Sequence, residues 1–255
     1  MKVTFLGTGS GKTSLKRFHS SLLFSLNDYN LLIDAGDGIS RALLNANVNY
    51  NSINGILFTH LHPDHFTGLG ALIVQMKMFN RVGPLEIYIY EKYVEDVNSF
   101  LLRCNIIPEK MDFKILYKPF SDKDEFTVND ELKILPRENS HLSGLKRYIQ
   151  YSNRTFYAAS FLFSHQNKRI LYTADIGSAD DLGLFKEFEV DVLISEITHI
   201  TISELSEKIK LFRFPKTYLT HITDGDEAEL AQSIKNLIIS EIKVELATDK
   251  QTFEF

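Results

Sequence analysis

Along this chain of 255 residues, hydrophobic residues occur in two kinds of pattern that alternate with each other. Short apolar runs bounded by Gly, Asn or Asp predict β-strands, and apolar residues spaced by three or four positions predict helices. Strands are expected at residues 3–6, 21–26, 30–34, 55–59, 85–90, 113–117, 132–135, 155–163, 169–173, 191–195, 216–220 and 244–248. Helices are expected at about 66–79, 91–104 and 202–212.

Two further helices carry start signals. Asp37 fits as the N-cap of a helix that runs to about residue 46. Asp226 and Glu229 form a pair resembling a capping box, ahead of a helix that continues to about residue 238. Because strands occur both in runs and between helices, the order predicts mixed sheets with helices packed outside them. With no linker or repeat in view, we expect one α/β (α+β) domain over residues 1–255.

Composition narrows the class of protein. The chain is 44% hydrophobic and 24% charged, as soluble globular proteins are, and its net charge of −5 argues against a generally basic nucleic-acid binder. Its one cysteine, Cys104, excludes an intrachain disulfide and is compatible with a reducing compartment. The apolar run at the start is short for a signal peptide, and no stretch approaches the length of a membrane span. We therefore expect a cytoplasmic protein without membrane contact.

The glycine-rich segment GTGSGKT at residues 7–13 resembles a phosphate-binding P-loop. That motif requires a Gly five residues before its Gly-Lys pair, and Leu6 stands there. The run that follows, from Ser21, predicts a strand, so no helix N-terminus is available to hold phosphate. We interpret the segment as a turn after the first strand. Its basic residues and histidine either face an anionic substrate or form a solvated loop: Lys12, Lys16, Arg17 and His19.

The strongest chemical signal is THLHPDH at residues 59–65. On an extended segment His60 and His62 point to the same side. Pro63 then ends the strand, so that Asp64 and His65 fall at the start of the next helix. Imidazole and carboxylate ligands suit zinc, and also manganese or iron. A bound divalent cation would also explain why so many ionisable side chains lie close together. We therefore interpret the cluster as a metal site.

This segment matches the H-x-H-x-D-H signature of the metallo-β-lactamase superfamily, and FLGTGSG with ILFTHLHPDH resembles its ribonuclease Z-like and phosphodiesterase branch. The resemblance extends in order over nearly the whole chain and implies a four-layer αββα sandwich of two mixed sheets with the site at one edge. Asp34, in LLIDAG, resembles the aspartate of the family's first motif, which supports the ligands without binding metal. His141, Asp175 and His221 lie where the remaining ligands are expected. From the residues alone, His141 can instead be a loop histidine and Asp175 a turn residue.

By this resemblance two divalent metal ions, taken as zinc with manganese or iron as alternatives, occupy the site. One is held by His60, His62 and His141. The second is held by Asp64, His65 and His221, with Asp175 bridging. A metal-bridging hydroxide would then attack the substrate, and Asp64 would accept a proton.

The proton donor is less clear from the family pattern. Ribonuclease Z-like enzymes carry a His-Glu-Ala-Thr motif where this chain has SEITH at residues 195–199. Ser195 replaces the usual histidine, so we interpret His199 as the general acid or a phosphate-positioning group; the alternative is a structural loop histidine. Glu196 is expected to orient the metal ligands without binding the metal itself. His165 adjoins a predicted hairpin turn and is expected to be solvated.

The resemblance favours a small or cyclic phosphodiester, or another anionic molecule, as substrate. Ribonuclease Z carries a long tRNA-binding arm between the ligands matching His141 and Asp175, and the short segment here indicates that such an arm is absent. RNA is therefore not the favoured partner, although tRNA 3′ processing stays an alternative. Thioester or lactone hydrolysis, or a metal-binding module without turnover, are further alternatives. The superfamily often dimerises, so a homodimer is compatible with the resemblance.

Overall fold

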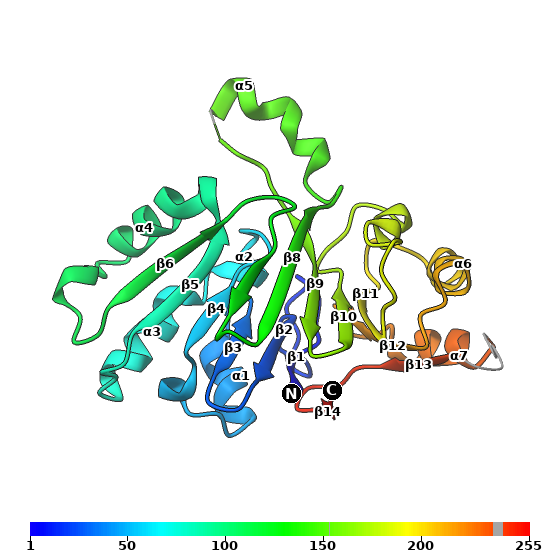
Figure 1. Cartoon of the computed structure of the whole chain (residues 1–255), viewed down its shortest axis with the longest axis horizontal. Helices are drawn as coiled ribbons and strands as arrows, with labels where there is room; N and C mark the ends of the chain where they lie inside the picture. Colours follow the sequence, from blue (N-terminus) through cyan, green and yellow to red (C-terminus); the bar gives the residue numbers. More distant parts are fainter. Residues whose placement is uncertain (153, 237–241) are drawn as a thin grey trace. The chain divides into compact units, whose positions relative to one another are not determined.

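A computed structural model describes residues 1–152, 154–236 and 242–255. The chain forms two compact units, Met1–Ser121 with Thr248–Phe255, and Asp122–Ala247. Each unit is built on one mixed seven-stranded sheet flanked by helices (Figure 1). Two such sheets are the framework that the sequence predicts. The expectation of one domain over the whole chain stays a prediction.

The first unit has strand order β14-β1-β2-β3-β4-β5-β6. The first four strands in this order pair antiparallel, and β3 to β6 pair parallel. The antiparallel strands are β14 (Thr252–Glu254), β1 (Lys2–Gly7), β2 (Ser21–Ser25) and β3 (Asn30–Ile33), and the parallel ones continue with β4 (Gly55–Leu57), β5 (Leu85–Tyr90) and β6 (Ile115–Phe120). Nearly every residue of β1 to β4 is buried, which explains their continuous apolar runs.

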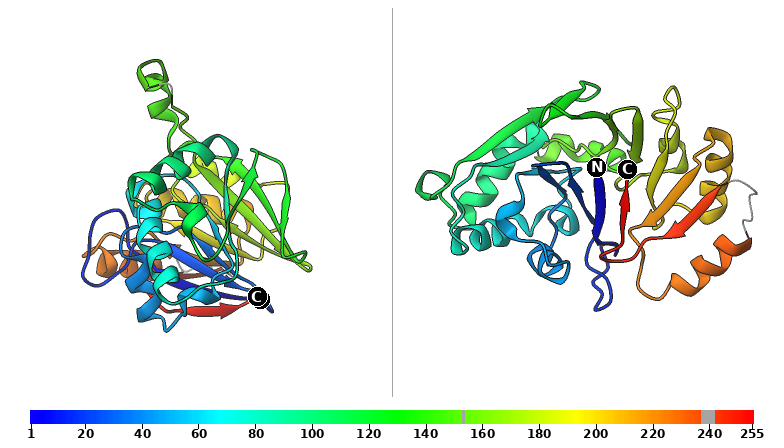
Figure 2. Two further views of the ribbon diagram at one scale, coloured as in Figure 1. Left: turned by 90° about the vertical axis from the view of Figure 1, so that its left-hand side faces the viewer. Right: turned by 60° about the horizontal axis from the view of Figure 1, so that its bottom comes forward.

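The helices of the first unit occupy the connections between its strands. They are α1 (Ile39–Asn45), α2 (Pro63–Phe66), α3 (Leu69–Met78) and α4 (Val94–Arg103), with short 3₁₀ turns η1 (Tyr50–Ser52), η2 (Glu91–Tyr93) and η3 (Pro108–Lys110). Helix α1 packs against α3 and β1. Both chain ends also belong to this unit: the Met1 amino group donates to the Phe255 carbonyl at 3.0 Å, and the ends lie side by side in Figure 2.

The second unit has strand order β13-β12-β11-β10-β9-β8-β7. Strands β7 to β10 are antiparallel, and β10 to β13 are parallel. The strands are β7 (Phe126–Val128), β8 (Leu132–Glu138), β9 (Ala159–His165), β10 (Lys168–Tyr172), β11 (Val192–Glu196), β12 (Lys216–Thr220) and β13 (Lys243–Leu246); the helices are η4 (Ser143–Tyr148), α5 (Ile149–Ser152), η5 (Ala179–Gly183), α6 (Ile202–Phe212) and α7 (Glu227–Asn236). The core of this unit joins sheet residues such as Leu193 and Leu219 to helix residues such as Leu205 and Ile209.

Most predicted elements are confirmed, and β5, α6 and β12 have the predicted bounds. The helix predicted at 66–79 is wrong in extent: α2 and α3 are separated at Thr67 and Gly68. A Cβ at Gly68 would lie 2.0 Å from the Gly36 carbonyl oxygen, so the chain passes very close there. The N-cap of α1 is Gly38, at φ 78°, and not Asp37. Helix α7 begins at Glu227, and residues 237–238 of the predicted helix lie outside the described residues.

Several short elements escape the sequence pattern. Strands β7 and β14 have three residues each, too few to display a period. Between β8 and β9, η4 and α5 form a short helical segment that Figure 1 and the left view of Figure 2 show standing away from the sheet of its own unit. The sequence predicts no long arm here, and the segment found is short.

Within the described part of the chain, no helix combines the length and the apolar character that crossing a bilayer requires. The cytoplasmic location that composition suggests stays a prediction.

Candidate metal centre

Most of the predicted site residues follow the carboxyl ends of parallel strands, and His141 follows the antiparallel strand β8. In the first unit Asp34 follows β3, and the THLHPDH segment follows β4. In the second unit Asp175 follows β10 and His221 follows β12, while Glu196 ends β11. Carboxyl ends of adjacent parallel strands meet at one edge of a sheet, which is where α/β proteins place their sites. Each unit therefore gathers its own half of the predicted residues.

Backbone strain marks the same strand ends. Asp34, Ala174 and His221 are non-glycine residues with positive φ values of 61°, 51° and 57°. Such conformations cost on the order of 1–3 kcal/mol each and persist where the surroundings enforce them, often at functional sites. The turns at these residues direct the chain sharply away from its strand.

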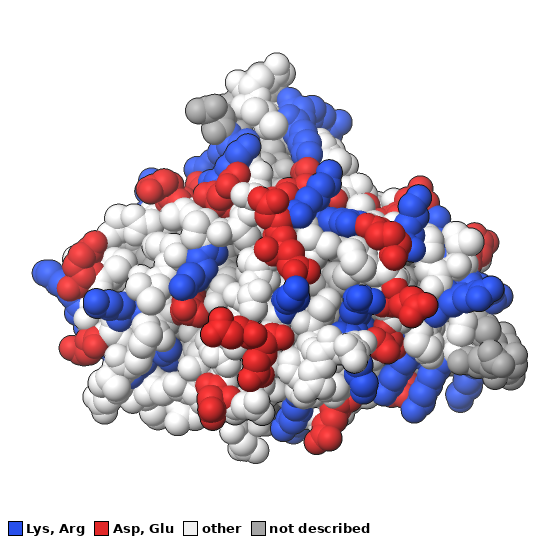
Figure 3. Space-filling view, viewed as in Figure 1, with Lys and Arg blue, Asp and Glu red and all other residues white. Residues whose placement is uncertain are grey.

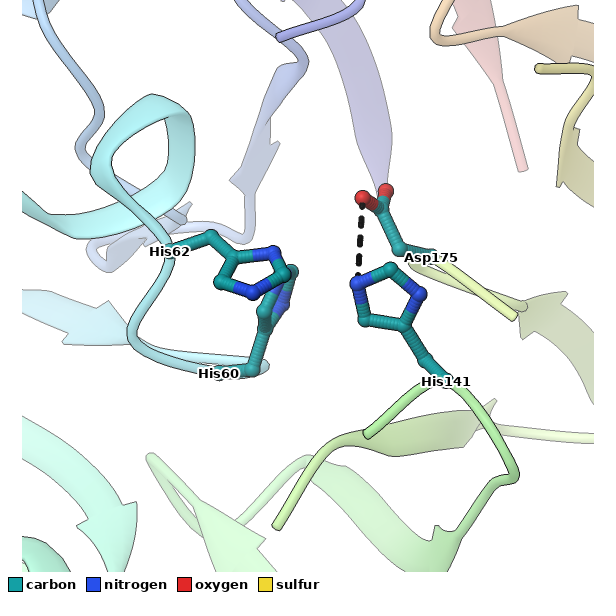
Figure 4. A group of neighbouring side chains, drawn as sticks. All are labelled: His60, His62, His141 and Asp175. Atoms are coloured by element: carbon teal, nitrogen blue, oxygen red, sulfur yellow. Dashed lines mark ion pairs between the residues drawn. The ribbon is translucent and has the colours of Figure 1, made fainter. Parts of the chain in front are cut away.

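The first unit brings the histidines of the THLHPDH segment into contact. The ring centroid of His60 lies 4.7 Å from that of His62 and 4.2 Å from that of His65. Asp64 Oδ2 lies 3.4 Å from His65 Nε2. His60 and His65 are buried, whereas His62 is half-buried. Figure 4 draws His60 and His62 on the loop that leads into α2. The spacing predicted from the sequence thus produces a compact His/Asp cluster.

Asp34 decides which nitrogen of two histidines carries the proton. It accepts from His65 Nδ1 at 2.7 Å and from the Thr59 hydroxyl at 2.8 Å. Since the Thr59 proton is directed to Asp34, the 3.0 Å contact between Thr59 Oγ1 and His60 Nδ1 requires His60 to donate. Both neutral rings therefore carry the proton on Nδ1 and the lone pair on Nε2. Burial raises the pKa of Asp34, while His65 and Thr59 counteract that rise.

The second unit places a carboxylate oxygen between two histidines. Asp175 Oδ2 lies 3.8 Å from His141 Nε2 and 3.4 Å from His221 Nε2. Figure 4 marks the first of these ion pairs by a dashed line. All three side chains are at least nine-tenths buried, with 8%, 4% and 4% of their surface exposed for His141, Asp175 and His221. The pattern is that of a cation-binding carboxylate with imidazoles on either side.

The tautomer of His221 is set by a threonine hydroxyl, as that of His60 is. The Thr198 hydroxyl donates to the His221 carbonyl oxygen. Thr198 Oγ1 can therefore only accept from His221 Nδ1, at 3.2 Å, which leaves the lone pair on His221 Nε2 beside Asp175.

His199 is held by Glu196. Its Nδ1 donates to Glu196 Oε1 at 3.0 Å, and its backbone N–H donates to Oε2 at 2.9 Å. The His199 ring lies 4.9 Å from the His141 ring and stacks on that of His221 at 5.8 Å. Its side chain is 36% exposed, unlike the neighbouring histidines. This imidazole is therefore the more exposed ring beside His141 and His221, and its Nδ1 is fixed by Glu196.

The side chains in each half fit a divalent cation. Histidine Nε2 atoms and carboxylate oxygens are the donor set of zinc, manganese and iron sites, and hydrogen bonds to Nδ1 are the usual way to aim Nε2 at a metal. One possible ligand atom each from Glu196, His199 and His221 also lies within 4.8 Å of the other two. Glu196, however, already accepts from Ile176, Thr198 and His199, so it serves as a scaffold for His199.

The glycine-rich loop turns its arginine inward. Arg17 Nη1 donates to Thr8 Oγ1 at 2.5 Å, and Thr8 donates to Asp249 at 2.7 Å. His19 Nδ1 donates to the Ser10 carbonyl at 2.7 Å. The loop leads into strand β2, as expected for a turn and not a P-loop.

His165 closes the predicted hairpin but is not solvated. Only 12% of its side chain is exposed, and its Nε2 lies 3.8 Å from Glu131. The expectation of a solvated residue is wrong because β8 packs beside β9 at this point, pairing Leu132 with His165.

Sequence reasoning missed several residues that hold the ligands. Thr59 and Thr198 set the tautomers described above, and Asn139 and Asp181 bind the backbone beside His141 and Asp175. Only one signal was available: Thr59 adjoins His60 in the motif. Asn139 lies in a loop and Asp181 in the short η5, where no periodicity identifies them.

The two mixed seven-stranded sheets with their flanking helices define a class of fold, that of the metallo-β-lactamase superfamily. The metallo-β-lactamase fold protein YhfI from Bacillus subtilis superimposes with a TM-score of 0.78 at 21% identity, covering 99% of this chain and 98% of that one. The short form of human tRNase Z, ELAC1, gives a TM-score of 0.75 at 20% identity, covering 100% and 99%. These similarities confirm the predicted fold class.

Within this superfamily, the family described as Anti-Pycsar protein Apyc1 matches residues 1–241, and the chain belongs to that family. A ribonuclease Z from Prochlorococcus marinus is 33% identical over 190 residues, which is 72% of this chain and 55% of that protein. The chain spans only 40% to 55% of the length of this and four further ribonuclease Z proteins that it matches.

Proposed function

We propose that this chain is a metal-dependent phosphodiesterase. His60, His62 and His141 would hold one divalent cation. Asp64, His65 and His221 would hold a second, with Asp175 shared between the two. The observation that carries the proposal is the common tautomer of His60, His65 and His221, each of which donates from Nδ1 and keeps its Nε2 lone pair for a ligand bond.

When bound, the cations would lower the pKa of a water molecule and neutralise charge on the phosphoryl oxygens. Zinc suits this donor set best, with manganese and iron as alternatives. Asp34 would hold His65 in orientation through its 2.7 Å hydrogen bond. Asp64, whose Oδ2 lies 3.4 Å from His65 Nε2, would accept a proton from the attacking water.

His199 would give a proton to the departing oxygen. Its Nδ1 is bound by Glu196, so Nε2 is the atom that exchanges the proton. A general acid must be held in orientation, and the hydrogen bond to Glu196 holds this ring. Its exposure matches this role, because the proton must be replaced from solvent after each turnover.

A small or cyclic phosphodiester is the substrate class that we favour. The net charge is −5, and acidic and basic side chains are interspersed on the face drawn in Figure 3, whereas proteins that grip long RNA present broad basic surfaces. In the described part of the segment between His141 and Asp175, strands β9 and β10 are preceded by the short η4 and α5 and by no long helical arm. The cytoplasm, where such compounds occur, is the location that we propose.

The test is hydrolysis by metal-loaded protein of bis-p-nitrophenyl phosphate, of 3′,5′-cyclic nucleotides and of a precursor tRNA, side by side. We expect turnover of the first two, and a loss of at least about 10³-fold for His60→Ala. His165→Asn is the matched control, since His165 lies at the turn end of β9 and its loss should leave activity unchanged. Metal-loaded protein without turnover of any phosphodiester would contradict the proposal.

The ribonuclease Z relatives support one alternative, tRNA 3′ processing. Cleavage of the precursor tRNA in the same assay, with no action on cyclic nucleotides, would favour it. Turnover of thioesters or lactones alone would indicate a carbonyl hydrolase. Stoichiometric metal with no turnover of any ester would indicate a binding module. A homodimer is compatible with each of these functions.

A further inference from the structure

Two loops of the second unit carry His141 and Asp175, and a single carboxylate ties these loops together. Asp181 lies on η5, with 9% of its surface exposed. Its Oδ2 accepts from the Ser140 hydroxyl at 2.7 Å and from the Gly177 N–H at 3.0 Å. The Ser140 N–H also points to this carboxylate, at 3.1 Å from Oδ2. Asp181 thus binds the residue before His141 and a residue two positions after Asp175.

The two loops approach so closely that one position excludes a side chain. A Cβ at Gly177 would lie 2.5 Å from both the carbonyl oxygen and the hydroxyl of Ser140. Backbone donors of both loops therefore converge on the same small volume. Asp181 supplies the acceptor oxygens that this convergence of donors requires.

Asn139 makes a second connection between the same loops. Its Oδ1 accepts from the His141 N–H at 3.1 Å, and its Nδ2 donates to the Asp175 carbonyl at 2.9 Å. It is buried, with 6% exposed. Two independent side chains thus fix the backbone on either side of the contact between His141 and Asp175.

We propose that Asp181 is a positioning residue for the metal centre, which sets the distance between the His141 and Asp175 side chains before any cation binds. This inference rests on the proposed function, because it assigns both side chains to a cation. Residues that orient ligands through hydrogen bonds commonly change metal affinity by 10–100-fold when they are replaced. Asp181 would act less directly, because its hydrogen bonds hold the loops that carry His141 and Asp175.

A merely structural role would come from the capping box that Asp181 forms with Ser178 at the start of η5. The chain offers controls that separate the two roles. Ser178→Ala removes the other half of the capping box and leaves the Ser140 contacts of Asp181 in place. Asp180→Asn removes the neighbouring carboxylate, which is 87% exposed and pairs with Lys208 at 2.6 Å.

The experiment compares the zinc affinity of the metal-free 255-residue chain and its variants by competition with a chromophoric chelator. We expect Asp181→Asn to bind zinc about 10-fold more weakly or worse, because its amide turns a donor toward the donors of Ser140 and Gly177. Asp180→Asn and Ser178→Ala should stay within about twofold of the parent. Circular dichroism and thermal unfolding in chelator check that each variant is folded.

If Asp181→Asn fails to fold, Ser140→Ala takes its place, because it removes only the hydroxyl donor; about a threefold loss of zinc affinity is then expected. Equal zinc affinity of the parent and the folded variant would overturn the inference and leave the proposed function standing. So would an equal loss in Ser178→Ala, since that would assign the effect to the helix cap. A parent that binds no zinc would contradict the proposed function itself, and the inference with it.

Discussion

His199 differs from its neighbours His141 and His221 in its exposure. It is 36% exposed, and its Nδ1 is occupied by Glu196, whereas that of His221 is occupied by the Thr198 hydroxyl. The rings of His141 and His221 lie beside it, and theirs are the Nε2 atoms that approach Asp175. The same residue type therefore has two chemical environments within a few ångströms: one suits a ligand and the other suits proton transfer.

A proton donor matters only when the leaving oxygen is basic. For His199→Asn we expect kcat to fall about 10²- to 10⁴-fold on a cyclic nucleotide, whose departing alkoxide needs a proton. On bis-p-nitrophenyl phosphate we expect a change of less than about fivefold, because p-nitrophenolate leaves unprotonated. Steady-state rates on both substrates check this. Equal losses on the two would assign His199 to substrate or metal binding instead.

Among the elements, the loop between β1 and β2 is held at both ends by one residue from the C-terminal segment. Asp249 accepts from the Thr8 hydroxyl at 2.7 Å and from the Phe18 N–H at 2.9 Å. Within this loop, a Cβ at Gly11 would lie 2.9 Å from Asp64 Oδ2, so the loop runs directly against the candidate metal ligand. Burial raises the pKa of Asp249 above its ordinary value of 3.8.

A raised carboxyl pKa means that the folded protein binds this proton more tightly than the unfolded chain. As pH rises from 3.8 through the folded-state pKa of Asp249, this residue therefore lowers the free energy of unfolding of the parent by a growing amount. We expect the Tm advantage of the parent over Asp249→Asn to shrink across that range, measured by thermal unfolding from pH 4 to 7. Asp249→Asn should also be cut faster by trypsin at Lys12 and Lys16. Asp28→Asn, in an exposed turn, is the control, and parallel Tm curves for parent and Asp249→Asn would contradict this account.

At the scale of the whole molecule, buried tyrosines govern behaviour in alkali. Tyr29 and Tyr88 donate to Glu86 at 2.6 and 2.7 Å, and burial raises the pKa of both phenols. Burial also raises the pKa of Tyr117 to about 12. Each phenol is therefore neutral in the folded protein at a pH where the unfolded chain ionises it.

An acid with a raised pKa loses its contribution to stability as pH rises above the unfolded value, which is 10.0 for tyrosine. We expect Tm to change little up to pH 9 and to fall steeply between about pH 10 and 12. Phenolate absorbance near 295 nm should rise together with unfolding. In Tyr117→Phe the fall should be shallower, with Tyr148→Phe, at a half-exposed ring, as the control. Ionisation of all tyrosines well before unfolding would contradict the assignment.

The local pattern of residues was sufficient to predict most helices and strands and about half of the residues of the candidate centre. Strand β5 and helix α6 follow from periodicity, and His60, His62, Asp64 and His65 lie within six positions of sequence, where a strand end and Pro63 decide their directions. His141, Asp175 and His221 could be assigned only through family resemblance, because each stands alone in its own loop. Even the N-cap of α1 was misplaced, since the left-handed turn at Gly38 leaves no hydrophobic signal.

By itself, the sequence determined the order of strands and helices and the composition of the THLHPDH cluster, because both depend on neighbours a few residues apart. Only the tertiary structure decided how the ligands are aimed. The hydrogen bonds that His65 donates to Asp34, His221 to Thr198 and Ser140 to Asp181 join residues 31, 23 and 41 positions apart. Such pairs arise when strand ends meet at one edge of a sheet, and no local period records that meeting.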